Sequence, residues 1–92
     1  MKITSDANKR TQTIEDRGLD FNDAAYVFAG RHFTTVDNRK DYGEIRQITV
    51  GFLQKRMVVV GWVQRGDSRH VFTMRKANER EVNKYRERLE QS

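Results

Sequence analysis

The sequence predicts an α+β fold in which helices pack against an antiparallel sheet. Two observations lead to this fold class. Apolar residues follow helical spacings in residues 1–30 and 78–92, whereas β-branched and aromatic residues dominate the stretch between them. Short polar turns separate the expected strands, and such turns favour antiparallel hairpins over parallel crossovers. The expected order is two helices, a four-stranded antiparallel sheet and a C-terminal helix.

Two short helices are expected at the N-terminus. Ser5 or Asp6 can cap a helix that begins at residue 7, and Gly18 supplies the left-handed residue that ends it after Arg17. Apolar residues spaced 3, 1 and 3 apart between Phe21 and Phe28 then place a stripe on a second helix. This stripe predicts core packing for the second helix, whereas the first has one large apolar residue, Ile14.

Four strands and a final helix follow. The strands are expected over Arg31 to Asp37, Glu44 to Phe52, Met57 to Gln64 and Ser68 to Met74. The third is the strongest β signal, because five of its residues are β-branched or aromatic, and this composition suits a central strand. After Arg75 and Lys76, Asn78 and Glu81 form a capping box that opens the last helix. Its inner stripe is Val82, Tyr85 and Leu89.

Length and composition exclude several classes of protein. The 92 residues fit one domain over 1–92, and a hydrophobic share of 36% predicts a thin core that a partner would stabilise. The chain has no cysteine and two histidines, which excludes disulfides and an ordinary closed zinc site, so no metal or cofactor is expected. No apolar run is long enough for a signal peptide or a membrane span, so we expect a cytoplasmic protein without membrane contact.

Charge is the first indication of function. Eighteen Lys and Arg against thirteen Asp and Glu give +5, which favours a polyanionic partner. The excess lies in the middle of the chain, where residues 31–76 carry ten basic and four acidic groups. Residues 1–30 carry four basic and five acidic groups, and residues 77–92 carry four of each. The alternative is an ordinary mixed-charge surface.

A set of polar residues near strand and helix ends could carry chemistry: Glu44, Arg46, Arg75, Lys76 and Tyr85. Guanidinium and ammonium groups suit a phosphate. In metal-free RNA cleavage the ribose 2′-hydroxyl attacks the adjacent phosphorus, so a site must remove that proton, stabilise negative charge and protonate the leaving oxygen.

Each candidate also has a structural explanation. Glu44 and Arg46 can pair with each other at the surface, Arg75 and Lys76 can be solvated, and Tyr85 can pack with its hydroxyl at the rim. His32 and His70 are expected to be structural or surface residues.

Four segments in order resemble the BrnT family: SDANK at 5–9, RGLDFNDA at 17–24, DNRKDYGEIR at 37–46, and TMRKAN at 73–78 followed by Glu81 and Tyr85. The resemblance covers nearly the whole chain. Three departures are Ser5 in place of a Trp, Asp16-Arg17-Gly18 in place of Lys-His-Gly, and Met74 in place of a small residue.

The resemblance implies a RelE-like fold and a metal-independent endoribonuclease that acts as the toxin of a type II toxin–antitoxin module and inhibits translation. It implies a BrnA-type antitoxin that wraps the toxin. The antitoxin would dimerise through a ribbon-helix-helix part and give an assembly of two toxins and two antitoxins. Operator DNA would be contacted by the antitoxin and not by the toxin. It implies that Arg46 and Arg75 bind the scissile phosphate, and that Tyr85 is a weaker member of the site. Lys9 would stabilise charge or donate a proton, and Glu44 would abstract one. Arg39 and Lys76 are expected to bind the RNA substrate.

Two other functions are open at this point. One is a non-catalytic module whose cationic sheet only holds a nucleic-acid backbone. The other is a structural protein whose basic face meets an acidic partner.

Overall fold

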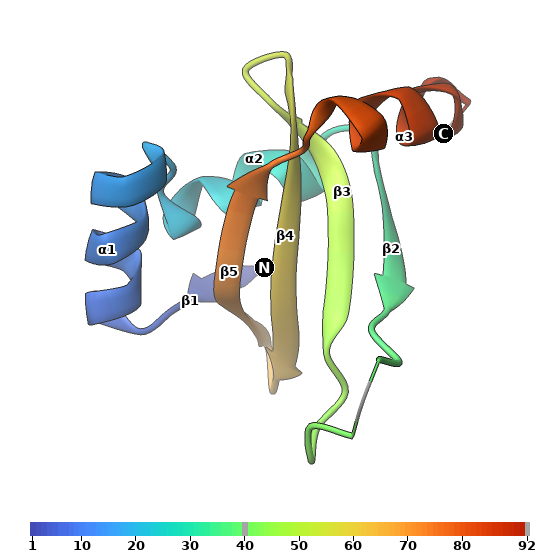
Figure 1. Ribbon diagram of the computed structural model, residues 1–92. Coiled ribbons are helices and arrows are strands. Elements are labelled where there is room, and N and C mark those ends of the chain that lie inside the picture. The colour runs from blue at the N-terminus through green and yellow to red at the C-terminus, as the bar shows by residue number, and fades with distance from the viewer. Residues whose placement is uncertain (40, 92) are drawn as a thin grey trace.

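The computed structural model describes residues 1–39 and 41–91, which form three α-helices and one five-stranded mixed sheet (Figure 1). In chain order the elements are β1 (Lys2–Thr4), α1 (Ala7–Arg17), the 3-10 turn η1 (Phe21–Asp23), α2 (Ala24–Ala29), β2 (His32–Val36), β3 (Gln47–Leu53), β4 (Arg56–Arg65), β5 (Ser68–Lys76) and α3 (Glu79–Glu90). The strand order across the sheet is β1-β5-β4-β3-β2. Lys40, within one of the family segments, lies outside the described residues.

The α+β class and the antiparallel meander from β2 to β5 are confirmed, but the four-stranded sheet is wrong in one respect. A fifth strand, β1, pairs parallel with β5 at the sheet edge, with Lys2 opposite Ser68. Three residues are too few to show a strand period, and their partner lies more than 60 residues away in the chain. The expected second helix is also split, because it opens as the 3-10 turn η1 before α2.

Two strand boundaries differ from the expectation and move candidate site residues. Strand β3 begins at Gln47, so Glu44 and Arg46 lie in the connection before it. Strand β5 continues to Lys76, so Arg75 and Lys76 lie within it rather than after it. The cause is the length of β4, which begins at Arg56 and offers pairing partners to both residues.

The helix ends agree with the sequence. The Asp6 side chain caps α1 by accepting a hydrogen bond from the Lys9 backbone nitrogen at 3.0 Å, and Gly18 ends the helix with a φ of 68°. Both halves of the capping box between Asn78 and Glu81 are present at the start of α3.

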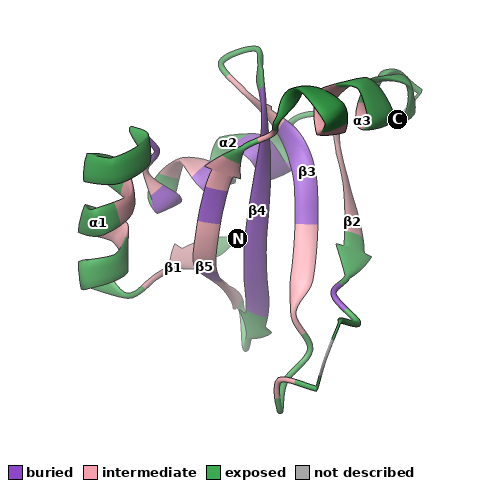
Figure 2. Ribbon diagram, viewed as in Figure 1, coloured by how far each residue is buried: buried purple, intermediate pink, exposed green. Residues whose placement is uncertain are grey.

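One face of the sheet packs against η1 and α2, with α1 beside them along β5 (Figures 1 and 2). The buried side chains of this face are Leu19, Phe21, Ala24, Val27, Phe28, Val58, Val60, Trp62, Val71 and Met74. Helix α1 buries none of its own residues, and Ile14 is exposed. Polar contacts hold it instead: Arg10 donates to both Asp20 carboxylate oxygens at 2.7 and 2.8 Å, and Arg17 donates to the Met74 carbonyl at 3.0 Å.

Among the described residues, the other face is covered only toward one end, where α3 crosses the sheet (Figure 1). Leu89 of α3 is fully buried in a second cluster with Val50, Met57 and Val59, and Val82 and Tyr85 pack against this cluster. The remainder of the face stays open between α3 and the connection from β2 to β3. In the described part of the chain, no helix combines the length and apolar character that a membrane span requires.

Candidate functional site

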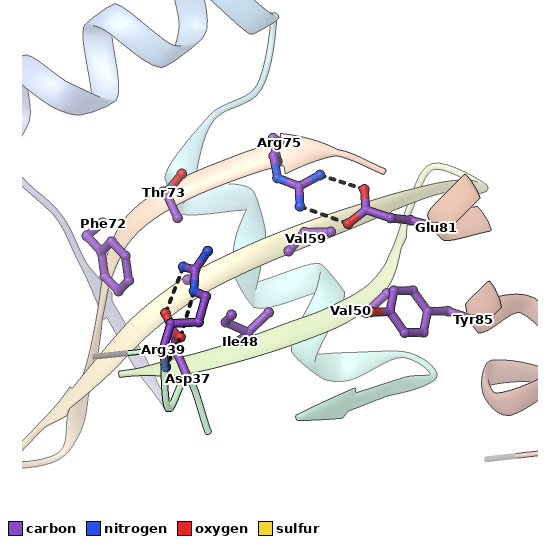
Figure 3. Close-up of a pocket in the computed structure, with 11 residues that line it drawn as sticks. Asp37, Arg39, Ile48, Val50, Val59, Phe72, Thr73, Arg75, Glu81 and Tyr85 are labelled. Atoms are coloured by element: carbon purple, nitrogen blue, oxygen red, sulfur yellow. Dashed lines mark hydrogen bonds and ion pairs between the residues drawn. The ribbon is translucent and has the colours of Figure 1, made fainter. Parts of the chain in front are cut away.

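A groove of about 290 Å³ occupies the open part of this second face (Figure 3). Its floor comes from the three central strands, one wall from the connection after β2, and the other from α3. The lining residues are Asp37, Arg39, Ile48, Val50, Val59, Gly61, Phe72, Thr73, Arg75, Glu81 and Tyr85. The groove therefore has an apolar floor with two arginines, two carboxylates and a tyrosine above it.

Arg75 is held by Glu81 in a two-pronged ion pair. Its Nη1 and Nη2 donate to the two carboxylate oxygens at 2.7 and 2.8 Å (Figure 3). The Glu81 carboxylate also accepts a hydrogen bond from the Asn78 backbone N–H at 3.0 Å. Glu81 therefore both completes the capping box of α3 and positions Arg75. The hydrogen bonds from Arg75 lower the pKa of Glu81 to about 2, and those same bonds raise the pKa of Arg75. Both groups are ionised at neutral pH.

Arg39 forms a second pair of the same kind with Asp37. Its Nε and Nη2 donate to the two Asp37 oxygens at 2.9 Å each (Figure 3). The Tyr42 hydroxyl donates to the same carboxylate at 3.3 Å. The Arg39 side chain is 78% exposed and that of Asp37 3%, so a buried carboxylate holds an exposed cation. The hydrogen bond from Arg39 lowers the pKa of Asp37 to about 2.

Both pairs leave the arginines able to bind an anion. A guanidinium has five N–H donors, and each carboxylate takes two of them. Because the remaining donors are fixed in direction by the pair, an anion that enters the groove meets cations that are already oriented. The four charges of the two pairs cancel, so any excess positive charge must come from neighbouring residues.

Arg46 supplies such a charge, at the edge of the groove. Its guanidinium carbon lies 4.0 Å from the Tyr42 ring centroid and 4.6 Å from that of Phe72. Its Nε is buried, and among the described residues it has no hydrogen-bond partner. The expected surface pair between Glu44 and Arg46 does not form. The Glu44 Oε1 instead lies 3.5 Å from the Arg65 Nη2.

Lys9 and Lys76 lie in different places. Lys9 lines a neighbouring hollow of about 180 Å³ with Arg17, Phe72 and Thr73, and the last two residues also line the groove. Lys76 lines a hollow near the covered face, with Gly18 and Val58. The structure therefore brings Arg39, Arg75 and Tyr85 together, places Arg46 and Lys9 beside them, and leaves Glu44 and Lys76 outside the groove.

Eight of the lining residues were not predicted from the sequence, and four of these are polar or aromatic: Asp37, Phe72, Thr73 and Glu81 as a partner of Arg75. The position of Glu81 could have been predicted, because its role in the capping box places it close to the end of β5. His32 and His70 line none of these hollows. His32 bonds the Gly30 carbonyl at 2.8 Å, and His70, whose pKa is lowered by burial, bonds the Thr4 hydroxyl at 3.0 Å.

Comparison with known proteins identifies the family. Among the described residues, no group of three His, Cys, Asp or Glu side chains is placed to hold a metal ion. No curated protein matches the chain. The family model of BrnT, the ribonuclease toxin of type II toxin–antitoxin systems, matches residues 6–81, a range that includes both arginine–carboxylate pairs. The chain therefore belongs to the BrnT family of ribonuclease toxins.

Proposed function

We propose that the groove binds single-stranded RNA and cleaves it without a metal ion, and that cleavage of RNA inhibits translation. The observation that carries this proposal is the pair of arginines in one groove, each oriented by a carboxylate on an otherwise uncovered sheet face. Such fixed donors stabilise a phosphate whose negative charge increases during the reaction. The family supports a ribonuclease.

The reaction we propose is an internal transfer. The ribose 2′-oxygen forms a bond to phosphorus, the bond from phosphorus to the 5′-oxygen breaks, and the products are a 2′,3′-cyclic phosphate and a 5′-hydroxyl. One proton passes from the 2′-hydroxyl to solvent water, and one reaches the 5′-oxygen from a donor in the site. Arg75 and Arg39 would bind the non-bridging oxygens, because both line the groove.

We assign proton transfer to fewer residues than the family resemblance implies. Carboxylates with a pKa of about 2 are weak bases at neutral pH, so Asp37 and Glu81 orient arginines rather than abstract protons. Glu44 lies outside the groove beside Arg65, and we give it no proton-transfer role. The Tyr85 hydroxyl and the Lys9 ammonium are the donors we propose for the leaving oxygen, from the groove wall and from the adjoining hollow.

Cleavage in the presence of EDTA tests this proposal. Purified protein should cut RNA equally well with and without the chelator, and the products should carry cyclic phosphate ends. Loss of cleavage in EDTA would contradict the metal-free reaction. Tight binding of many RNAs without cleavage would support the non-catalytic alternative.

A type II system implies an antitoxin partner. We propose that it is of the BrnA type, that it covers the groove, and that it contributes all contact with operator DNA. A dimeric DNA-binding part would give two toxins and two antitoxins. Light scattering of the co-expressed pair, together with ribonuclease assays of the free and bound toxin, tests both points. A one-to-one mass would contradict the tetramer, and undiminished cleavage would contradict occlusion.

A further inference from the structure

Phe72 is an aromatic side chain that contributes to neither hydrophobic cluster of the protein. Its neighbours on β5, Val71 and Met74, are fully buried against the helices. Phe72 is half-buried and instead lines both the groove and the hollow that contains Lys9. An aromatic ring outside the core, between two hollows that each contain two basic side chains, is poorly explained by stability alone.

A β-bulge and a glycine determine where this ring lies. The β4–β5 register shifts so that Gly61 pairs with Thr73 while Trp62 pairs with Val71, which leaves Phe72 as the extra residue of a bulge. The ring lies over Gly61, where an added Cβ would come 2.8 Å from the Phe72 Cζ and 2.6 Å from the Thr73 Cγ2. Only a glycine at this point of β4 lets the ring lie against the groove floor.

A cation and a second ring brace Phe72 from the side of the β2–β3 connection. The Arg46 guanidinium carbon lies 4.0 Å from the Tyr42 ring centroid and 4.6 Å from that of Phe72. The Tyr42 hydroxyl donates to Asp37, the carboxylate that holds Arg39. Ring, cation and phosphate-binding arginine therefore belong to one connected arrangement. In Figure 3 the Phe72 ring stands at the β5 side of the groove, on the same side of the sheet as Arg39.

We infer that Phe72, braced by Arg46 and Tyr42, is the stacking platform for a nucleobase next to the scissile phosphate. This inference rests on the proposed function for the identity of the ligand as RNA. Single strands bind proteins by stacking bases on aromatic rings while cations follow the backbone. With one phosphate at Arg39 and Arg75, a base on Phe72 directs the chain toward the hollow beside Lys9, where Arg17 would hold the next phosphate.

Fluorescence of 2-aminopurine tests the platform directly. Short RNAs with a 2′-methoxy group at the cleavage position bind without being cut, and 2-aminopurine is placed on either side of that position. Binding to the wild-type protein should quench one of the two probes. In Phe72→Leu the quench should disappear and Kd should rise about tenfold, within the range for one stacked base. Phe72→Trp should restore both.

The control is Tyr26→Leu, which removes a 70% exposed aromatic ring from α2 and should leave quenching and Kd unchanged. Because Phe72 carries no charge, Phe72→Leu should not alter the salt dependence of Kd, whereas Lys9→Ala should reduce it. Unchanged quenching and affinity in a folded Phe72→Leu protein would overturn the platform. Wild-type protein that binds and quenches but never cleaves would contradict the proposed function while leaving the platform supported.

Discussion

Two neighbouring residues on β5 show how differently the two faces of the sheet are built. Met74 faces the helices and is fully buried, whereas the Arg75 side chain faces the groove and is 42% exposed. On the helix side, apolar side chains meet along the strands. On the groove side, α3 closes one end, and the polar residues of the open part are held by ion pairs.

Stability comes mainly from the covered face, and we propose that function belongs to the open one. In a chain with 36% hydrophobic residues, leaving part of a sheet face uncovered reduces an already small buried apolar area. The ion pairs of the groove are partly exposed and contribute little stability in return. We propose that the open face is retained because it binds RNA, so mutations on the two faces should separate folding from activity.

The largest effect on stability is expected at Phe21, which is 1% exposed on the covered face. Phe21→Ala should lower the free energy of unfolding by about 3–5 kcal/mol, a large part of the total for a small domain. Phe72→Ala on the open face should cost about 1 kcal/mol or less. Urea denaturation of the two variants checks this, and equal losses would contradict the division between faces.

The largest effect on activity is expected at Arg75. Arg75→Ala removes donors aimed at the phosphate and should lower single-turnover cleavage about 10²-fold, with little change in RNA affinity. Arg75→Lys should recover only part of the rate, because a lysine cannot form the two-pronged contact. Arg80→Ala, an exposed arginine on α3, is the matched control. A normal rate in folded Arg75→Ala protein would exclude Arg75 from the reaction.

Local signals predicted most of the fold. The bounds of α1 and the caps at Asp6, Gly18 and Asn78 agree with the structure, because each depends on residues a few positions apart. The strand β1 and the bulge at Phe72 depend on pairing between distant segments, which no local pattern records. Strand β3 begins later than expected. The contacts of Tyr42 with Asp37 and with Arg46 form in the connection before the strand, and the sequence did not predict them.

Three of the candidate site residues lie together in the structure, although the contacts that hold them were not predicted. Arg39, Arg75 and Tyr85 do line one groove. Whether a residue of β5 points into the groove depends on where the strand ends and on its bulge, so adjacent Arg75 and Lys76 were treated alike although they line different hollows. Charge counting also missed that each groove arginine has its own carboxylate, which cancels the local charge.

A smaller effect, on stability and cleavage together, is expected at Gly61. Gly61→Ala places a Cβ within 3 Å of the Phe72 and Thr73 side chains, so these must shift toward the groove. Overpacking of this kind costs about 1–3 kcal/mol, and cleavage should fall together with stability. Gly30→Ala, where the nearest contact is at 3.7 Å, is the control and should leave cleavage unchanged. A crystal structure of Gly61→Ala with Phe72 unmoved would contradict the role of the glycine.

The smallest effect is the pH dependence of the groove pairs, and its sign follows from the lowered pKa of Glu81. Its pKa is about 2 in the folded protein against about 4.5 when unfolded, so ionised Glu81 contributes stability fully above pH 4.5. That contribution should disappear as the pH falls from about 4.5 to 2. Because Arg75 is partly exposed, solvent screening limits it to on the order of 1 kcal/mol.

The measurement is the free energy of unfolding between pH 2 and 7 for the wild type and for Glu81→Gln, which keeps the side-chain shape without the charge. The wild type should lose more stability than the variant between pH 4.5 and 2, and the two should change in parallel above pH 5. Cleavage between pH 5 and 9 should show no acid limb from this carboxylate, since it is fully ionised there. A loss of cleavage near pH 6 that is abolished in Glu81→Gln would show that Glu81 exchanges a proton during the reaction, and would replace its positioning role with a catalytic one.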